Sequence, residues 1–113
     1  MEAPFTSHHF SDDEGRPAGG SSYGDGFTVS WQNGPLGRGD SRSLPNGAFV
    51  ETIIAVAVDR LEYYQSSGFA CAENQAAIDA LLRAKAELES RTARREQAGI
   101  EGTHGVDRDH EAG

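Results

Sequence analysis

Residues 48–65, AFVETIIAVAVDRLEYYQ, decide the fold because their apolar side chains recur at the spacing of an α-helix. One stripe of this helix holds Val50, Ile54, Ala57, Leu61 and Tyr64. The stretch also contains four charged residues within its apolar part. The pattern therefore predicts a packed helix over about 48–65 and not a membrane span.

A second helix is predicted over about 71–98, after a break at Ser66-Ser67-Gly68. Its apolar positions are Ile78, Leu81, Leu82 and Leu88. Two helices joined by a short link form an antiparallel hairpin, here over 47–98. Because the first helix has more apolar surface than one partner covers, we expect the protein to be an oligomer.

The regions flanking the hairpin have different patterns. Residues 27–32, FTVSWQ, alternate apolar and polar side chains, which predicts a half-buried strand within a strand and loop element at 27–46. This strand needs a partner, for which the alternatives are a returning strand near 36–43, a stretch with little apolar content, and a strand from another copy of the chain. Residues 1–26 are rich in Gly, Ser and Asp without a period, and we expect them to be disordered. We expect residues 99–113 to form a C-terminal loop and acidic tail. The predicted fold class is α+β: a small N-terminal antiparallel β element plus a long antiparallel two-helix hairpin, oligomeric.

The charge of the chain is unevenly distributed. Its 113 residues include 18 Asp and Glu against 10 Lys and Arg, a net charge of -8. Residues 1–46 carry -3, residues 47–98 carry -2 and residues 99–113 carry -3, so most of the excess acid lies outside the hairpin. This balance excludes a nonspecific DNA or RNA binder, which needs a basic surface. A small, enclosed anion remains compatible with the hairpin.

Composition also bounds the location of the protein. The hydrophobic share is 36%, below the roughly 45–50% of globular chains, so the core is small. No run is long enough to span a membrane, and the N-terminal region lacks the apolar core of a signal peptide. The single cysteine, Cys71, has no partner for an internal disulfide. We expect a cytosolic protein without a membrane partner.

Three arginines, Arg91, Arg94 and Arg95, lie together at the end of the second helix. One interpretation is a helix C-terminus, where cations complement the macrodipole and Glu87 pairs with Arg91. The other is an anion site, since guanidinium groups suit phosphate oxygens and stack on purine rings. The residue pattern leaves both open.

A second cluster consists of Tyr63, Tyr64, Phe69 and Asn74, at the opposite end of the hairpin. Aromatic residues there are typical of a core, and an asparagine in the first turn of a helix is typical of a local backbone contact. The predicted folded region shows no Ser/His/Asp set, paired carboxylates or metal-ligand spacing. We therefore expect no catalytic residues, no metal and no cofactor.

Five segments together resemble a known family. They are Trp31–Pro35 (WQNGP), Ile54–Glu62 (IAVAVDRLE), Phe69–Asn74 (FACAEN), Ser90–Glu96 (SRTARRE) and Gly99–His104 (GIEGTH). In this order they resemble the Thoeris anti-defence 1 proteins of bacteriophages, over about residues 27–106. The resemblance implies a sponge that holds cyclic ADP-ribose isomers, the signals of the bacterial Thoeris immune system, without cleaving them.

The resemblance also implies the binding residues. Tyr64 and Arg91 are expected to sandwich the adenine, while Asn74 and Arg95 hydrogen-bond the ribose and phosphate part. The C-terminal loop within 99–113 is expected near the ligand. Asn74 and Arg91 are 17 residues apart on one predicted helix, or about 25 Å. One small ligand reaches both only if two subunits share the site, one supplying Tyr64 and Asn74 and its partner supplying Arg91 and Arg95.

The predicted function is therefore a noncatalytic phage sponge for a cyclic ADP-ribose isomer, acting in the cytoplasm of the infected bacterial host. Its predicted partners are that nucleotide and itself, as a homodimer or as a hexamer made of three dimers, with no DNA, RNA or membrane. The alternatives are a sponge for cyclic oligonucleotide signals, a noncatalytic helical-hairpin adaptor for another protein, and a nucleotide-hydrolysing enzyme.

Overall fold

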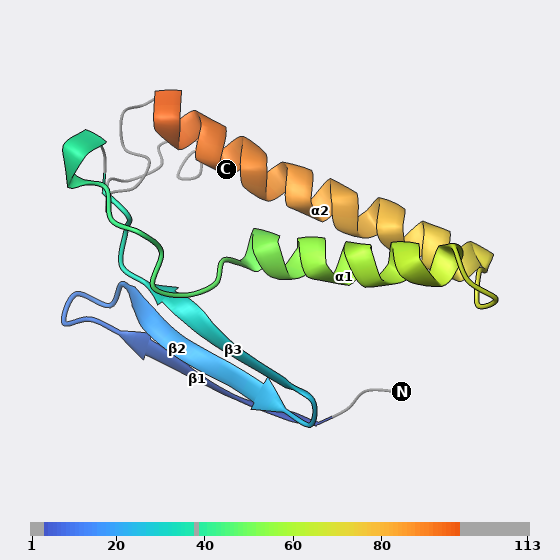
Figure 1. Ribbon diagram of the computed structural model, residues 1–113. Helices are drawn as coiled ribbons and strands as arrows, with labels where there is room; N and C mark the ends of the chain where they lie inside the picture. The colour runs from blue at the N-terminus through green and yellow to red at the C-terminus, as the bar shows by residue number, and fades with distance from the viewer. Residues whose placement is uncertain (1–3, 38, 98–113) are drawn as a thin grey trace. The chain divides into compact units, whose positions relative to one another are not determined.

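The computed structural model describes residues 4–37 and 39–97. It contains three strands, β1 (Phe5–Ser11), β2 (Pro17–Gly24) and β3 (Phe27–Asn33), a short 3-10 helix, η1 (Gly39–Ser41), and two helices, α1 (Val50–Gln65) and α2 (Ala72–Gln97) (Figure 1). The described chain divides between Phe49 and Val50 into a sheet unit and a hairpin unit. The α+β class and the two helices are confirmed.

The sheet unit is an antiparallel meander in the order β1-β2-β3. Its register pairs Ser7 with Ser22 and Ser22 with Val29, so these three side chains share one face. The predicted strand at 27–32 is confirmed as β3. Its partner, however, comes from upstream: residues 17–24, expected to be disordered, form β2, and residues 5–11 form β1. The expectation of disorder across 1–26 is wrong for these strands.

A polar contact at the centre of the sheet explains part of that error. The Ser22 side chain is the buried polar group of the described chain. Its Oγ lies 2.7 Å from Ser7 Oγ and accepts a hydrogen bond from Trp31 Nε1 at 3.0 Å. Ser22 thus links all three strands without an apolar side chain, so the alternation that marks an ordinary strand is absent from β2.

The other part of the error comes from a close approach between the backbones of β1 and β2. Gly20 has a φ of 137°, and a Cβ at this position would collide with the backbone carbonyl of His8 in β1. Only glycine tolerates both this positive φ and this close contact with the His8 backbone. The glycines that suggested disorder therefore allow β1 and β2 to approach each other.

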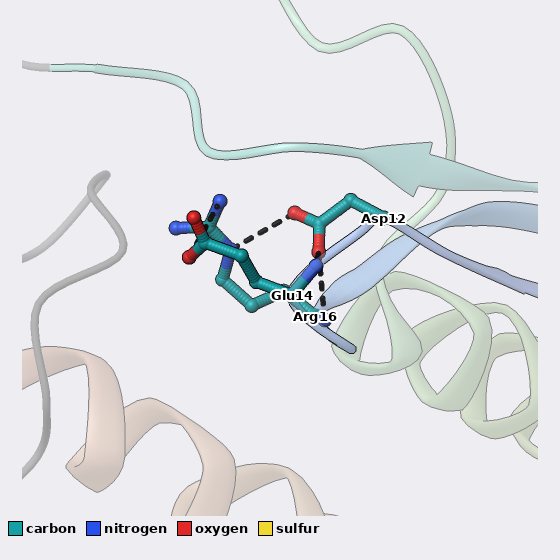
Figure 2. A network of polar contacts seen from close by, with 3 residues as sticks. All are labelled: Asp12, Glu14 and Arg16. Carbon is teal, nitrogen blue, oxygen red and sulfur yellow. Dashed lines mark hydrogen bonds and ion pairs between the residues drawn. The ribbon is translucent and has the colours of Figure 1, made fainter.

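The turn between β1 and β2 is closed by Asp12 (Figure 2). The backbone N–H groups of Glu14 and Arg16 donate to Asp12 Oδ1 at 2.9 and 3.0 Å, and Arg16 Nε donates to Oδ2 at 2.9 Å. These contacts, the hydrogen bond from the Arg16 backbone foremost, lower the pKa of Asp12. Asp12 therefore stabilises the turn as a carboxylate.

The segment after β3 is held to it by side chains. Asn46 accepts a hydrogen bond from the Asn33 N–H at 2.8 Å and donates to the Asn33 carbonyl at 3.0 Å. A short parallel bridge also joins Trp31 to Ala48. The returning strand expected near 36–43 is wrong: this stretch holds η1, and β3 is already paired with β2.

The hairpin unit consists of α1 and α2, which lie side by side (Figure 1). Val58 and Ile78 are its buried apolar residues, 7% and 4% exposed. Up to Thr92, the buried or half-buried residues of α2 recur every three or four positions: Asn74, Ile78, Leu81, Lys85, Leu88 and Thr92. This spacing is the seam of two long packed helices.

The two helices differ in length. α1 has 16 residues and α2 has 26, and Figure 1 shows the last turns of α2 extending beyond the first turn of α1. They begin and end within one or two residues of the predicted bounds 48–65 and 71–98, and the loop and tail expected at 99–113 lie outside the described residues. Neither helix is long and apolar enough to cross a membrane.

Candidate functional site

The closed end of the hairpin is the connection between α1 and α2. Two serines cap α1: Ser66 Oγ donates to the Tyr63 carbonyl at 2.8 Å, and Ser67 Oγ donates to the Tyr64 carbonyl at 2.6 Å. Phe69 N–H then donates to Ser67 Oγ at 3.1 Å. These bonds satisfy carbonyls that the helix end leaves open, so the connection is fixed by its own polar groups.

Tyr64 lies in the last turn of α1, is half-buried, and is the residue expected to stack on a base. Its ring centroid is 6.0 Å from that of Tyr63, with the rings tilted by 53°. The guanidinium carbon of Arg60 lies over both rings, 4.9 Å from the Tyr63 centroid and 5.0 Å from the Tyr64 centroid. The closed end therefore presents two aromatic rings and one cation on the same side of α1.

Asn74 lies in the first turn of α2. Its Nδ2 donates to the Phe69 carbonyl at 3.0 Å, which agrees with the interpretation of a local backbone contact. This bond uses one N–H of the side-chain amide and leaves the Oδ1 acceptor out of the contact. Asn74 is thus held in place at the closed end, beside the last turn of α1 that carries Tyr64.

The arginines lie at the other end of α2. Arg91 is exposed, while Arg94 and Arg95 in the last turn are half-buried. Within residues 72–97, Arg91 forms no ion pair with Glu87, whereas Lys85 Nζ pairs with Glu89 Oε2 at 3.1 Å. The exposed Arg91 guanidinium keeps its hydrogen-bond donors available to a ligand.

The four expected site residues fall into two groups. Tyr64 and Asn74 belong to the closed end. Arg91 and Arg95 belong to the C-terminal turns of α2, which form the free end of the hairpin. Because α2 is one continuous helix from Ala72 to Gln97, Asn74 and Arg91 are separated by about 25 Å along its axis. The structure does not bring the two groups together within one chain.

Comparison with known proteins finds a relative in a Bacillus phage. The chain is 46% identical over 77 residues to a protein named Thoeris anti-defense 1 from Bacillus phage SBSphiJ7. The match covers 68% of this chain and 51% of the relative, so the chain spans about half of the relative's length. The chain belongs to the Thoeris anti-defence 1 family. This confirms the resemblance carried by the sequence motifs. No family model matches the chain.

Sequence reasoning left one residue out of the closed end of this Thoeris anti-defence 1 chain. The sequence pattern predicts only a charged position of the first helix at Arg60, whereas in the structure its guanidinium lies over two tyrosine rings. Tyr63 and Tyr64 follow it by three and four residues, the spacing at which helical side chains meet. That spacing is the signal that identifies the contact.

Metal ligands are not grouped in this family member as far as the structure describes it. Residues 4–37 and 39–97 contain no cluster of three His, Cys, Asp or Glu side chains suited to a metal ion. His8 and His9 are consecutive in β1, so their side chains point to opposite faces of the sheet.

Proposed function

We propose that the protein binds a cyclic ADP-ribose isomer and sequesters it intact in the cytoplasm of the infected bacterial host, so that the Thoeris effector stays inactive. The observation that carries this proposal is the 46% identity to a phage protein whose name places it against Thoeris. A signal-dependent defence is blocked when the signal is bound more tightly than the effector binds it. The protein then needs affinity and no catalysis.

The proposed binding residues suit the two parts of such a ligand. Tyr64 presents an aromatic face to the adenine, and Arg91 supplies a planar cation for the opposite face of the base. Asn74 hydrogen-bonds the ribose, and Arg95 binds the phosphate oxygens through its guanidinium donors. All four groups stack or hydrogen-bond, and none of them is a strong nucleophile at neutral pH.

Two subunits are proposed to share each site. The separation of about 25 Å between Asn74 and Arg91 along α2 exceeds the reach of one small nucleotide. A two-fold axis that places the closed end of one hairpin against the free end of another joins the two groups and creates two equal sites per dimer. The low number of buried apolar residues in the hairpin supports the same association. The proposed assembly is a homodimer or a hexamer of three dimers.

A capture experiment tests the function. The protein is incubated with each cyclic ADP-ribose isomer, freed of unbound nucleotide by gel filtration and denatured by heat, and the released material is analysed by mass spectrometry. We expect release of one isomer unchanged. The matched control is Arg83→Ala, which removes an exposed arginine of α2 outside the proposed site.

Other outcomes of this experiment identify the alternatives. Release of a cleaved product contradicts the sponge and indicates a hydrolase. Absence of captured nucleotide contradicts the proposal and favours a helical-hairpin adaptor, in which Asn74 serves only its contact with the Phe69 carbonyl. In a parallel incubation with cyclic oligonucleotides, capture of these in place of cyclic ADP-ribose would reassign the ligand.

A further inference from the structure

Arg60 holds an unusual position on the surface of α1. It is exposed, and its guanidinium carbon lies about equally far from the centroids of the Tyr63 and Tyr64 rings, at 4.9 and 5.0 Å. Within the described chain it forms no ion pair with a carboxylate. Its interactions with the Tyr64 side chain, the hydrogen bond foremost, raise the pKa of Arg60.

The charges around the closed end make this cation distinctive. Between Ser43 and Leu82 the sequence contains Arg60 as its single Lys or Arg. The carboxylates of the same stretch are Glu51, Asp59, Glu62, Glu73 and Asp79. Glu51 lies at the other end of α1, so an anionic ligand approaching Tyr64 and Asn74 meets the remaining four carboxylates, and Arg60 is the cation of this stretch able to offset them.

We propose that Arg60 contacts a phosphate group of the bound nucleotide, as a third arginine of the site and the one supplied by the same subunit as Tyr64 and Asn74. This inference rests on the proposed function and extends it. The site then has arginines on both sides of the subunit boundary, of which Arg95 and Arg60 bind phosphate and Arg91 stacks on the adenine. Arg91 and Arg95 come from the free end of one α2, and Arg60 comes from the closed end of the partner hairpin.

The stacked position prepares Arg60 for this role. The guanidinium carbon lies over both tyrosine rings, and a guanidinium has five N–H donors, so donors beyond the one that contacts the Tyr64 side chain remain for a phosphate. Contact with two rings restricts the side chain before the ligand arrives, so less conformational entropy is lost on binding. An unstacked lysine at the same position has neither property, because its ammonium is a strongly hydrated point charge on a flexible stem.

The test measures affinity for the cyclic ADP-ribose isomer that the wild-type protein captures. Arg60→Met keeps the length of the side chain and a favourable contact with the tyrosine rings, but removes the charge. We expect binding to weaken by about tenfold, as for loss of a charge-assisted hydrogen bond to phosphate. The salt dependence of the affinity should also become less steep, since one cation fewer meets the ligand.

Three controls make the result decisive. Arg83→Met changes an exposed arginine of α2 and should leave the affinity unchanged. Arg60→Lys should recover only part of the loss. Far-UV circular dichroism melts of the three variants should match the wild type, because Arg60 lies on the exposed side of α1. Equal affinities and salt slopes for Arg60→Met and wild type, or tighter binding by Arg60→Met, would overturn the inference while leaving the proposed function intact. Failure of the wild-type protein to capture any isomer would overturn the proposed function itself.

Discussion

The sheet unit and the hairpin unit are stabilised by different interactions. In the hairpin, Val58 and Ile78 are almost fully removed from water, and the half-buried seam of α2 repeats around them. In the sheet, the large apolar side chains Phe5 and Phe10 remain 57% and 59% exposed, and the most buried side chain is a serine. Apolar burial therefore accounts for the hairpin, whereas hydrogen bonds and close backbone contact account for the sheet.

The difference shows where substitutions act in each unit. A helix pair that depends on burial responds to lost side-chain volume, in proportion to how far a residue is removed from water. A sheet that depends on backbone pairing responds to changes that disturb the fit of its strands or leave a polar group unpaired. The four predictions below test this contrast, beginning with the largest effect.

Ile78→Ala is expected to destabilise the hairpin by about 3 kcal/mol, because it empties volume at a residue that is 4% exposed. Denaturant unfolding followed by far-UV circular dichroism measures the loss. Leu82→Ala is the matched control: Leu82 is 48% exposed, and its truncation should cost far less. Similar losses for the two variants would mean that the seam is not the source of stability.

Gly20→Ala is expected to destabilise the sheet by about 2 kcal/mol, because the added Cβ meets the His8 carbonyl and the φ of 137° disfavours alanine. The fluorescence of Trp31, the single tryptophan of the chain, reports on the sheet during unfolding. Gly26→Ala separates the two causes, since Gly26 also has a positive φ but nothing within 4 Å of its Cβ position. Equal losses in both variants would assign the whole effect to φ.

Ser22→Ala is expected to cost about 1.5 kcal/mol, because it removes the acceptor of the Trp31 Nε1 hydrogen bond and the partner of Ser7 Oγ. The same fluorescence measurement applies. Ser21→Ala, on the opposite face of β2, is the control and should leave the unfolding midpoint close to that of the wild type. A neutral Ser22→Ala variant would contradict the polar account of the sheet.

Asp12→Asn is expected to destabilise the sheet least of the four variants, and only at a pH above the lowered pKa of Asp12. The pKa of Asp12 in the folded protein is lowered from 3.8, so the ionised group stabilises the turn above that value. This contribution disappears as the pH falls through the lowered pKa. Unfolding of wild type and Asp12→Asn should therefore differ at neutral pH and converge in acid. Asp13→Asn is the matched control, and a constant difference at every pH would exclude this linkage.

The sequence predicted the elements whose stability comes from apolar burial. The helical period of residues 48–65 and 71–98 indicated both helices, because Val58 and Ile78 must face a partner. The same reasoning missed β1 and β2, since a serine contact and a glycine at a backbone crossing leave no apolar period. The strand β3 was predicted from its alternation, but its partner was not, because pairing between strands is a long-range property.

The candidate site was predictable to a similar extent. Hairpin geometry places Tyr64 beside the start of α2, where the structure has Asn74. The local bond from Asn74 to the Phe69 carbonyl was anticipated from its place in the first turn. The position of Arg60 depends on side-chain rotamers, and spacing alone does not specify them. The apolar period of the first helix predicts an oligomer, but it does not specify which surfaces of two subunits would meet.

The most direct test of the account mixes two defective chains. Asn74→Ala lacks a closed-end residue, and Arg95→Ala lacks a free-end residue, so neither homodimer should capture a cyclic ADP-ribose isomer well. If the chains are unfolded and refolded together in equal amounts, half of the dimers contain one of each, and one of their two sites is intact. We predict recovery of about one quarter of the wild-type binding capacity. No recovery above that of the separate variants would contradict a site shared between two subunits.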